Sequence, residues 1–383
     1  MNTDKLNAQI DLANRQLDGN SLDQAAETLR RAACEHPFEF KVHSLLRLVL
    51  LRQGDWPGLY AEFERFLDRH PSAQTDWEKS CLSLLFGRMP QGWDQYESRW
   101  RTPGIELRSE EHISPQPQWR GDSFVGKTLL LRWEQGLGDA IMFVRYAPMV
   151  KALGGQVLLE VVAPLVDVLA TCPGIDGIIK DGDPLPPFDL QTPLLSLPRI
   201  FRTDLDSIPA DIPYLAVPNR VPHRESIDKI MAPTEGLLRI GLVWSGGAKH
   251  VRDSERSIPP VVMQPLEALP GVVWHSFQTG HGKEMPFPRI VPMGPVIGGS
   301  FSDTAYALSK MDLVITVDTS VAHLAGALGI PTLLLVTTFP DWRWLMGRDD
   351  SPWYPTMRIY RQPMPGDWAS VIAQVVSDLS SCG

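Results

Sequence analysis

A polar turn between a hydrophobic strand and a short helix is the part of this sequence best suited to anion chemistry. Residues 313–331 read as a strand over 313–317, a polar turn, and a helix that ends before Gly329. Asp, Thr and Ser are favoured at helix N-caps, and a helix that starts after a buried strand offers free N–H groups to a phosphate. The turn therefore predicts a diphosphate site, with an ordinary capped turn as the alternative. Its candidate ligands are Asp318, Thr319, Ser320 and His323.

An acidic residue opens another predicted helix. The segment 134–139, Glu-Gln-Gly-Leu-Gly-Asp, follows a strand predicted over 127–133. It is not the dinucleotide-binding fingerprint, because that pattern needs a third glycine and the chain has Ile141 there. Asp139 would repel a pyrophosphate, while the helix N-terminus would stabilise its carboxylate form. We expect Asp139 to be either a general base that faces a cleft or a simple helix cap.

The strand predicted over 238–244 leads into glycines and then into cations. Trp244-Ser-Gly-Gly247 forms a flexible turn, and Lys249, Arg252 and Arg256 follow it closely. These side chains could neutralise a diphosphate leaving group, arginine through its planar fork and lysine as a point charge. The alternative is a solvated loop whose charges cancel with two neighbouring carboxylates.

Two aromatic segments, 341–344 (Asp-Trp-Arg-Trp) and 351–354 (Ser-Pro-Trp-Tyr), flank a charged loop after the strand predicted over 332–336. Ligands of open α/β sheets bind beyond the carboxyl ends of the strands. These aromatic side chains could therefore stack on a base or a sugar, or they could form the core of a rigid loop.

The sequence gives no indication of a metal site. No cluster of His, Cys and carboxylate residues has the spacing of metal ligands, and the four cysteines form no CxxC pair. Asp181-Gly-Asp183 matches a string that some transferases use to hold a metal, but it runs into prolines and is explained by turn chemistry. We expect no metal.

Past residue 105, short hydrophobic strands alternate with helices, which predicts a parallel sheet with helices on both faces. The pattern is interrupted by a polar, proline-rich connection around 213–235 and then restarts. Two Rossmann-like halves that face a cleft would hold a nucleotide and a second substrate. The first run has strands at 127–133, 156–162, 177–180 and 188–190 and a helix at 140–153, and the second has strands at 238–244, 272–278, 313–317 and 332–336 and a closing helix at 367–379.

The first hundred residues are helical and repetitive. A segment that begins at Asn20 and ends at His36-Pro37 is echoed by one that begins at Gly54 and ends at His70-Pro71. The offset is 34 residues, which is the period of tetratricopeptide repeats. Such repeats usually offer a groove to a peptide or protein, or they buttress the neighbouring domain. The two histidines precede proline at matching positions, which indicates a structural role.

Composition excludes several classes of protein. Of the 383 residues, 43% are hydrophobic and 21% are charged, and the formal net charge is −9, which argues against a general nucleic-acid binder. No apolar run is long enough to span a bilayer, and the N-terminus has no signal-peptide core. Four cysteines without a disulfide-like pattern fit a reducing compartment. We expect a cytoplasmic protein.

From about Trp119 to Leu379 the chain resembles the heptosyltransferase-like glycosyltransferases (family nine, GT-B fold). It is most similar to the bacterial branch that carries N-terminal tetratricopeptide repeats. One departure is Ser320, where heptosyltransferases often carry glycine. The segments that carry the resemblance are 133–139, 143–146, 195–198, 242–246, 253–257, 317–329, 341–344 and 351–355.

This resemblance implies that a sugar is transferred from a nucleotide-diphosphate donor to an acceptor hydroxyl, with inversion and without a bound metal. The nucleotide sugar is a co-substrate, and no cofactor is expected. Asp139 falls on the family's Gly-Asp position, where the acidic residue serves as general base. The resemblance and the motifs together assign nucleotide-sugar binding to Trp244, Ser245, Gly246, Arg256, Gln278, Asp318, Thr319, Ser320 and His323, and the acceptor side to Gln135, Gly136, Gly138 and Arg145.

The expected architecture is therefore an α/β GT-B protein preceded by an all-α tetratricopeptide-like domain. Helical repeats would occupy 1–104, a Rossmann-like acceptor domain 105–235, and a Rossmann-like nucleotide-sugar domain 236–383. The expected partners are a nucleotide sugar and a protein or glycan acceptor bound through the repeats, with no nucleic acid and no membrane span. Two alternatives stay open: a non-catalytic adaptor whose transferase halves are a relic, and a transferase that adds N-acetylglucosamine to Ser or Thr of proteins.

Overall fold

The computed structural model describes residues 2–102, 115–234, 236–247, 252–279 and 284–381. It divides into two compact units, Met1–Ile105 with Asp341–Gly347, and Glu106–Pro340 with Arg348–Gly383. The predicted boundaries between the repeats and the first Rossmann-like half, and between the two halves, fall on residues outside the described ranges. The three domain spans therefore remain a prediction.

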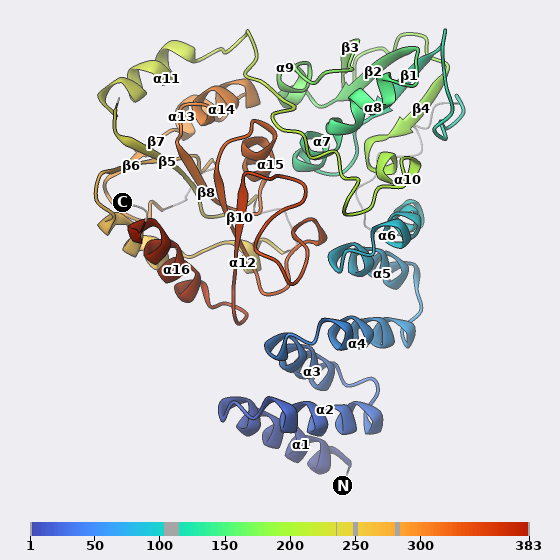
Figure 1. Cartoon of the computed structure of the whole chain (residues 1–383), viewed down its shortest axis with the longest axis vertical. Helices are drawn as coiled ribbons and strands as arrows, with labels where there is room; N and C mark the ends of the chain where they lie inside the picture. Colours follow the sequence, from blue (N-terminus) through green and yellow to red (C-terminus); the bar gives the residue numbers. More distant parts are fainter. Residues whose placement is uncertain (1, 103–114, 235, 248–251, 280–283, 382–383) are drawn as a thin grey trace. The chain divides into compact units, whose positions relative to one another are not determined.

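The first unit is built from helices in which each packs against the next along the chain (Figure 1). The predicted all-helical N-terminal region is thus confirmed, while the tetratricopeptide assignment stays a prediction. The helices are α1 (Asn2–Asp18), α2 (Leu22–Glu35), α3 (Phe40–Gln53), α4 (Trp56–Asp68), α5 (Ala73–Leu85) and α6 (Met89–Tyr96), followed by a 3-10 turn at Glu97–Arg101.

Local sequence explains the ends of these helices. Asn20 and Gly54, which are 34 residues apart, both adopt left-handed backbone angles (φ 57° and 68°) in the turns after α1 and α3. Asparagine and glycine tolerate this conformation best. The side chain of Asp55 then caps α4 by accepting from the N–H of Gly58 at 2.9 Å. Nδ1 of His70 donates to the carbonyl oxygen of Phe66 at 2.8 Å, so this histidine has a structural partner, as expected.

A seven-residue segment from the far end of the sequence completes this unit. Residues 341–347 pack against α5 and α6, where the indole of Trp342 makes edge contacts with the rings of Trp93 and Tyr96. The N–H of Met346 donates to the carbonyl of Leu85 at 3.0 Å. Trp342 and Trp344 are 3% and 1% exposed. The helical unit therefore needs residues made long after its own helices.

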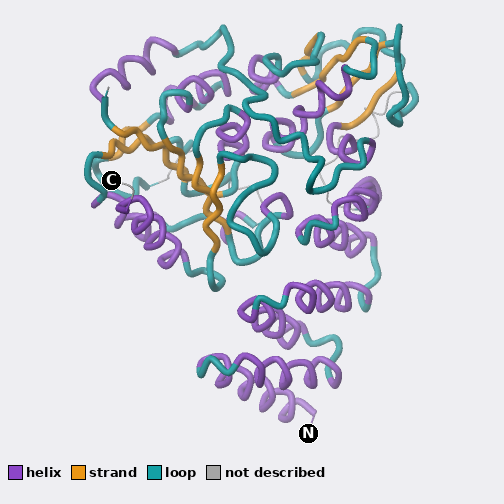
Figure 2. The backbone as a smooth tube through the Cα atoms, in the orientation of Figure 1, coloured by secondary structure: helices purple, strands orange, loops and turns teal. Residues whose placement is uncertain are grey.

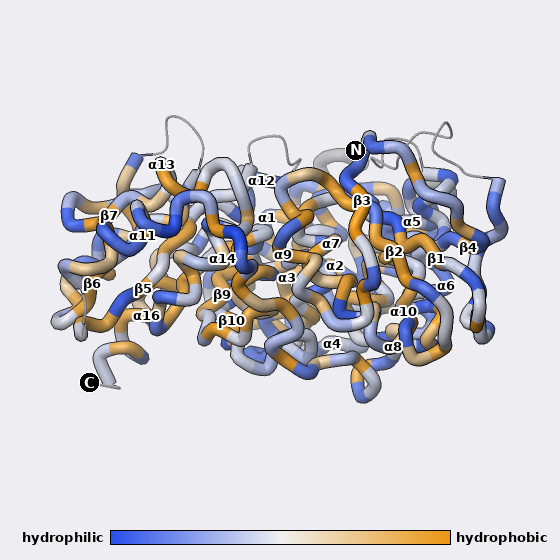
Figure 3. Tube along the Cα trace, turned by 90° about the horizontal axis from the view of Figure 1, so that it is seen from above, coloured by the Kyte–Doolittle hydropathy of each residue, from blue (hydrophilic) through white to orange (hydrophobic). Residues whose placement is uncertain are grey.

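The second unit contains two lobes, each with a parallel sheet. The N-terminal lobe has strand order β3-β2-β1-β4, with every neighbouring pair parallel. Hydrophobic residues run along β1 and β2 (Figure 3), as expected for strands covered on both faces. The elements of this lobe are β1 (Thr128–Arg132), α7 (Leu137–Phe143), α8 (Ala147–Lys151), β2 (Gln156–Val161), α9 (Val166–Leu169), β3 (Gly177–Lys180), β4 (Leu190–Pro193) and α10 (Leu197–Ile200).

The helix predicted over 140–153 is wrong in detail. The chain forms α7, a 3-10 turn at Val144–Tyr146 and α8 instead of one continuous helix. Pro148 lies in the first turn of α8, and proline is well tolerated there but breaks the interior of a longer helix.

The C-terminal lobe has a six-stranded parallel sheet in the order β10-β9-β8-β5-β6-β7, with helices interleaved along the chain (Figure 2). The prediction of two parallel-sheet α/β halves behind a helical region is therefore confirmed. The elements are α11 (Arg224–Met231), β5 (Leu238–Val243), α12 (Asp253–Arg256), β6 (Val272–Ser276), β7 (Ile290–Pro292), α13 (Gly294–Ile297), α14 (Phe301–Leu308), β8 (Leu313–Val317), α15 (Ser320–Ala327), β9 (Thr332–Val336), β10 (Met357–Arg361) and α16 (Trp368–Ser381).

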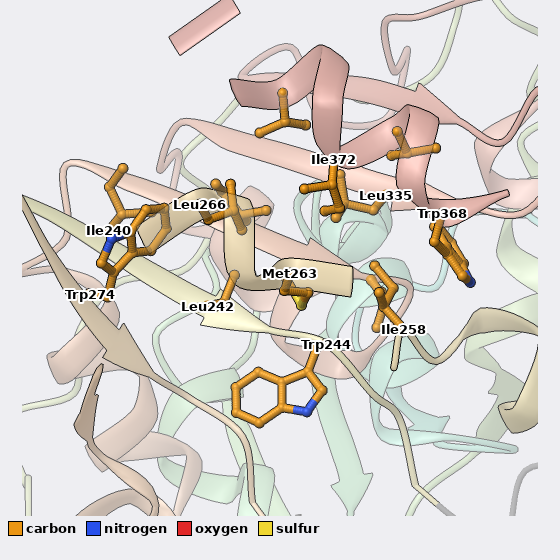
Figure 4. Packing of buried hydrophobic residues seen from close by; sticks show 14 of the residues in the cluster. Ile240, Leu242, Trp244, Ile258, Met263, Leu266, Trp274, Leu335, Trp368 and Ile372 are labelled. Atoms are coloured by element: carbon orange, nitrogen blue, oxygen red, sulfur yellow. The ribbon is translucent and has the colours of Figure 1, made fainter. Parts of the chain in front are cut away.

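A hydrophobic core fixes α16 and the 3-10 helix Pro260–Ala268 to this sheet (Figure 4). The predicted apolar face of the closing helix is confirmed, because Trp368, Val371, Ile372 and Val375 are all buried. The sheet behind the site is thus held by side chains that have no role in chemistry.

Candidate active site

The strand order of the C-terminal lobe defines where a ligand would bind. From β5 the chain moves to β6 and β7 on one side, and from β8 it moves to β9 and β10 on the other. The carboxyl ends of β5 and β8 therefore form a topological switch point, the usual ligand position in open α/β sheets. Two turns that the sequence singled out, 244–247 and 318–320, follow these two strands directly.

The N-terminus of α15 has backbone donors to offer. Thr319 is its N-cap residue in extended conformation and makes no side-chain capping bond. Within the described part of the chain, no acceptor pairs with the backbone N–H of Ser320 or Val321. Asp318, Thr319 and Ser320 are half-buried. Free, accessible N–H groups at a helix N-terminus favour an anion.

Arg256 joins the two turns. Its Nη1 donates to the carbonyl of Asp318 at 3.0 Å, and its Nε donates to Asp253 Oδ1 at 3.3 Å. A Cβ on Gly246 would lie 2.3 Å from Arg256 Nη2, so only glycine leaves room for this guanidinium. Arg256 thus brings positive charge to the base of the α15 turn. Lys249, the other predicted cation, lies outside the described residues.

Gln278 and Trp244 hold the backbone of the turn after β5 in place, Gln278 through hydrogen bonds and Trp244 through its buried side chain. Gln278 Oε1 accepts from the N–H groups of Ser245 and Trp244 at 3.0 and 3.3 Å, and its Nε2 donates to the carbonyl of Ser245 at 3.1 Å. Trp244 is 1% exposed and lies in the core of the lobe (Figure 4). These contacts fix the backbone of the turn rather than present side chains to a ligand.

In the N-terminal lobe, the carboxyl ends of β1 and β4 form a second switch point. Buried Glu134 holds the two turns together, because its Oε1 accepts from the N–H of Leu195 at 3.2 Å. Asp139 is half-buried in the first turn of α7, and its Oδ2 accepts from the N–H of Gly136 at 2.8 Å. The cap interpretation of Asp139 thus has a contact in the structure, through one of its two carboxylate oxygens. The neighbouring Gln135 adopts a positive φ of 60°.

The two lobes meet where α7 packs against α15. A Cβ on Gly138 would lie 2.7 Å from Cδ2 and 3.3 Å from Nε2 of His323, so the imidazole edge lies directly on the α7 backbone. Gly138 immediately precedes Asp139 in the same helical turn. The helical turn that carries the acidic residue of one lobe thus touches the histidine of the other.

Arg145 lies behind this contact rather than on an open surface. It is 3% exposed, its Nη1 donates to the carbonyl of Trp353 at 2.6 Å, and its Nη2 donates to the hydroxyl of Tyr214 at 3.0 Å. Burial alone would lower the pKa of this guanidinium, but the phenols of Tyr214 and Tyr354 outweigh it and raise the pKa. Its predicted role on the acceptor side stays a prediction. Its hydrogen bonds connect the N-terminal lobe to Trp353 of the C-terminal lobe.

Of the two interpretations of the aromatic segments, the burial of their side chains favours the core of a loop over stacking on a ligand. Trp342 and Trp344 are buried in the helical unit, and Trp353 and Tyr354 are fully buried in the second unit. What the sequence analysis missed is the hydroxyl of Tyr354, which lies 2.9 Å from Nδ1 of His323. Its only signal in the sequence was membership of the Ser351–Tyr354 run.

No family model matches the sequence. The chain is 27% identical over 336 residues to Protein FlbA of Caulobacter vibrioides, an alignment that covers 80% of this chain and 55% of FlbA. The chain thus spans about half the length of this curated relative.

Solved structures match about two thirds of the chain. The glycosyl transferase family 9 protein from Veillonella parvula matches with a TM-score of 0.50 and 12% identity, over 69% of this chain and 100% of that one. The ADP-heptose heptosyltransferase II of Escherichia coli matches with a TM-score of 0.44 and 11% identity, over 66% and 98% of the two chains. The chain therefore shares the GT-B fold of the Veillonella parvula protein, as the resemblance implied.

One expectation needs correction. The sequence analysis predicted no metal and no cofactor, yet the matched structures include an iron-containing dodecameric glycosyltransferase, TibC, from enterotoxigenic E. coli, with a TM-score of 0.42, 12% identity and 68% and 78% coverage. Absence of metal therefore does not follow from the resemblance. Among the residues that the structure describes, there is no group of three or more His, Cys, Asp or Glu that could hold a metal ion.

None of the helices in the described ranges is both long and apolar enough to cross a lipid bilayer.

Proposed function

We propose that this chain is an inverting glycosyltransferase that moves a sugar from a nucleotide-diphosphate donor to an acceptor hydroxyl. The observation that carries the proposal is the contact between Gly138 and His323. Asp139 directly follows Gly138 in α7, and His323 lies about one turn into α15, at whose start the N–H groups of Ser320 and Val321 have no acceptor among the described residues.

In the proposed reaction the donor diphosphate binds at the start of α15. The N–H groups of Ser320 and Val321, the hydroxyl groups of the turn and the positive end of the helix would meet its oxygens. Arg256 would add a positive charge at the base of the turn, where it holds the carbonyl of Asp318. These donors are fixed before the reaction, so they can stabilise charge as it grows on the leaving group.

Asp139 would accept the proton of the acceptor hydroxyl while that oxygen attacks the anomeric carbon. The bond between this carbon and the diphosphate oxygen breaks, and its electron pair leaves with the diphosphate. Attack from the face opposite the leaving group inverts the anomeric configuration. A positioned base of this kind contributes roughly 10²–10⁴-fold in rate.

The helical unit is proposed to bind the acceptor, a protein or a glycan. The proposal rests on the predicted 34-residue repeat and on the successive packing of α1 to α6. A cytoplasmic location is supported by the unpaired thiols of Cys34, Cys81 and Cys172.

The first test is a panel of ADP-, UDP-, GDP- and CMP-sugars in a melting-temperature assay on the full chain. A donor at 100 times its Kd should stabilise the protein by about 2.7 kcal/mol. Inorganic pyrophosphate serves as a control for the diphosphate alone. If no sugar nucleotide raises the melting temperature and none is hydrolysed or transferred, the chain is not a glycosyltransferase and the adaptor alternative takes its place.

A further inference from the structure

A buried arginine without a counter-charge lies in the helical unit. Arg47, on α3, is 8% exposed, and arginine is seldom buried to this extent unless it is paired. Within the described part of the chain, its Nε and Nη2 have no hydrogen-bond partner, and its guanidinium takes part in no ion pair. Burying an unpaired charge costs free energy. The contacts of the fold therefore give no reason for a charge at this position.

Aromatic rings hold the guanidinium in place of carboxylates. Its central carbon lies 4.2 Å from the ring centroid of Phe63 and 4.7 Å from that of Phe66, both on α4. The rings attract the cation through their faces, but they accept none of the N–H groups, which lie in the plane of the guanidinium. Arg47 is thus positioned while its hydrogen-bond donors stay unused.

The nearby carboxylates do not satisfy Arg47. Glu62 is 1% exposed, but its Oε1 pairs with Nδ1 of His43, and its Oε2 accepts from Nη1 of Arg65 at 2.8 Å. Burial lowers the pKa of Arg47 to about 10, although the charges of Glu62 and Glu78 partly oppose this effect. The guanidinium therefore stays charged at neutral pH.

Exposed aromatic side chains extend from Arg47 to the surface. Phe40 lies seven residues before Arg47, on the same face of α3; it is 65% exposed, and its ring makes an edge contact with that of Phe66. Phe38 is 67% exposed, and its ring meets that of His70, which also lies against Phe66. The rings of Phe38, Phe40, Phe66 and His70 form a continuous aromatic surface. Exposed apolar patches of this kind mark interaction sites.

A ligand on the aromatic surface can reach the guanidinium. Of its three nitrogens, Nε and Nη2 are fully buried, and Nη1 is not. The stem of arginine is flexible, so a small rotation brings a second nitrogen toward the same ligand. An acceptor that approaches from the side of Nη1 would therefore give Arg47 the partner that it lacks.

We propose that Arg47 and the aromatic surface bind an acidic segment of a protein partner, with a carboxylate against the guanidinium and an apolar side chain on the rings of Phe38 and Phe40. Charge complementarity favours the carboxylate, because Arg47 is a buried cation with unused donors. A carboxylate carries one charge, so Glu62 and Glu78 repel it less than they repel a phosphate monoester. That this partner is the sugar acceptor rests on the proposed function, while the binding site does not.

The melting temperature of the free chain separates a binding role from a structural one. Arg47→Met keeps an apolar side chain but removes the unpaired charge, so the melting temperature should not fall. Arg15→Met, which removes an exposed arginine of α1, is the matched control. A clearly lower melting temperature for Arg47→Met than for this control would show that the arginine serves the fold, and the inference would be overturned.

Binding is tested by selecting peptides from a phage-displayed random library on the full chain, without sugar nucleotide. Peptides enriched on the wild type should carry Asp or Glu beside an apolar residue and should bind Arg47→Met at least tenfold more weakly, as expected when a central arginine is lost. Arg47→Lys keeps the charge without the planar fork and should bind them with intermediate affinity. Phe40→Ala should also weaken them, and Arg15→Met should bind them as the wild type does.

Several results would count against the inference. Enriched peptides without a carboxylate, or with equal affinity for the wild type and Arg47→Met, would overturn it. Absence of any enriched peptide would also overturn it, and binding of soluble polygalacturonate to the wild type but not to Arg47→Met would then identify an acidic glycan as the partner. None of these measurements depends on sugar transfer, and the panel of sugar nucleotides tests the proposed function separately.

Discussion

Replacing Gly138 with alanine tests the contact on which the site depends. The new Cβ would lie 2.7 Å from Cδ2 of His323, whereas ordinary contacts begin at 3.4 Å. The ring or the helix must therefore yield by about 0.7 Å. His323 is 4% exposed and bonded to Tyr354, so it has little freedom to swing away.

The expected cost in stability is modest. Overpacking of this kind costs about 1–3 kcal/mol, and the better helix propensity of alanine offsets up to about 1 kcal/mol of it. The melting temperature should fall by a few degrees. The cost in function should be larger, because a displacement approaching 1 Å of a group that positions substrate can lower turnover by about 10²-fold.

The assay measures melting temperature and sugar transfer in parallel for wild type, Gly138→Ala and Gly299→Ala. A Cβ on Gly299 has no atom within 4 Å, so this control should match the wild type in both. If Gly138→Ala transfers sugar at the wild-type rate, His323 and α7 do not form a site together, and the argument for a shared active site is refuted.

Three further outcomes are expected. Asp139→Asn keeps an acceptor for the N–H of Gly136, so it should bind donor normally and lose roughly 10²–10⁴-fold in turnover. The control is Asp167→Asn, at a half-buried position on α9, and unchanged turnover of Asp139→Asn would remove Asp139 as the base. Arg256→Gln should weaken donor affinity at least tenfold in equilibrium titration, because it removes the charge that supports the turn at Asp318, and wild-type affinity would contradict that role. Trp342→Ala should destabilise the helical unit by about 3–5 kcal/mol in denaturant unfolding, and a loss below 1 kcal/mol would show that segment 341–347 is dispensable there.

Elements were predicted best from the sequence where the spacing of hydrophobic residues and the residue types of the adjoining turn indicated the same boundary. The strand 313–317 and its polar turn were predicted at the bounds that β8 and α15 have, because a buried parallel strand reads as a continuous apolar run. The helix over 140–153 failed because Pro148 was read as part of a longer apolar pattern, while in the chain it starts a new short helix.

Side-chain roles were harder to predict than strands. Trp244 and Trp342 lie beside candidate ligand turns in the sequence, but both are buried in cores. The bond between His323 and Tyr354 joins residues 31 positions apart, and neither local propensity nor spacing reports on such a pair. The role of Gly138 could not be predicted for the same reason. It must lack a side chain because the imidazole of His323, from the other lobe, lies against its backbone.

The segment 341–347 has a consequence for biosynthesis. The ribosome finishes the helices of the first unit by about residue 102, but the tryptophans that fill the gap between α5 and α6 emerge some 240 residues later. At 5–20 residues per second the nascent helices wait roughly 12–50 s for them. During that interval Trp93 and Tyr96 lack the ring contacts that Trp342 makes with them, so the surface of α6 that carries them stays uncovered.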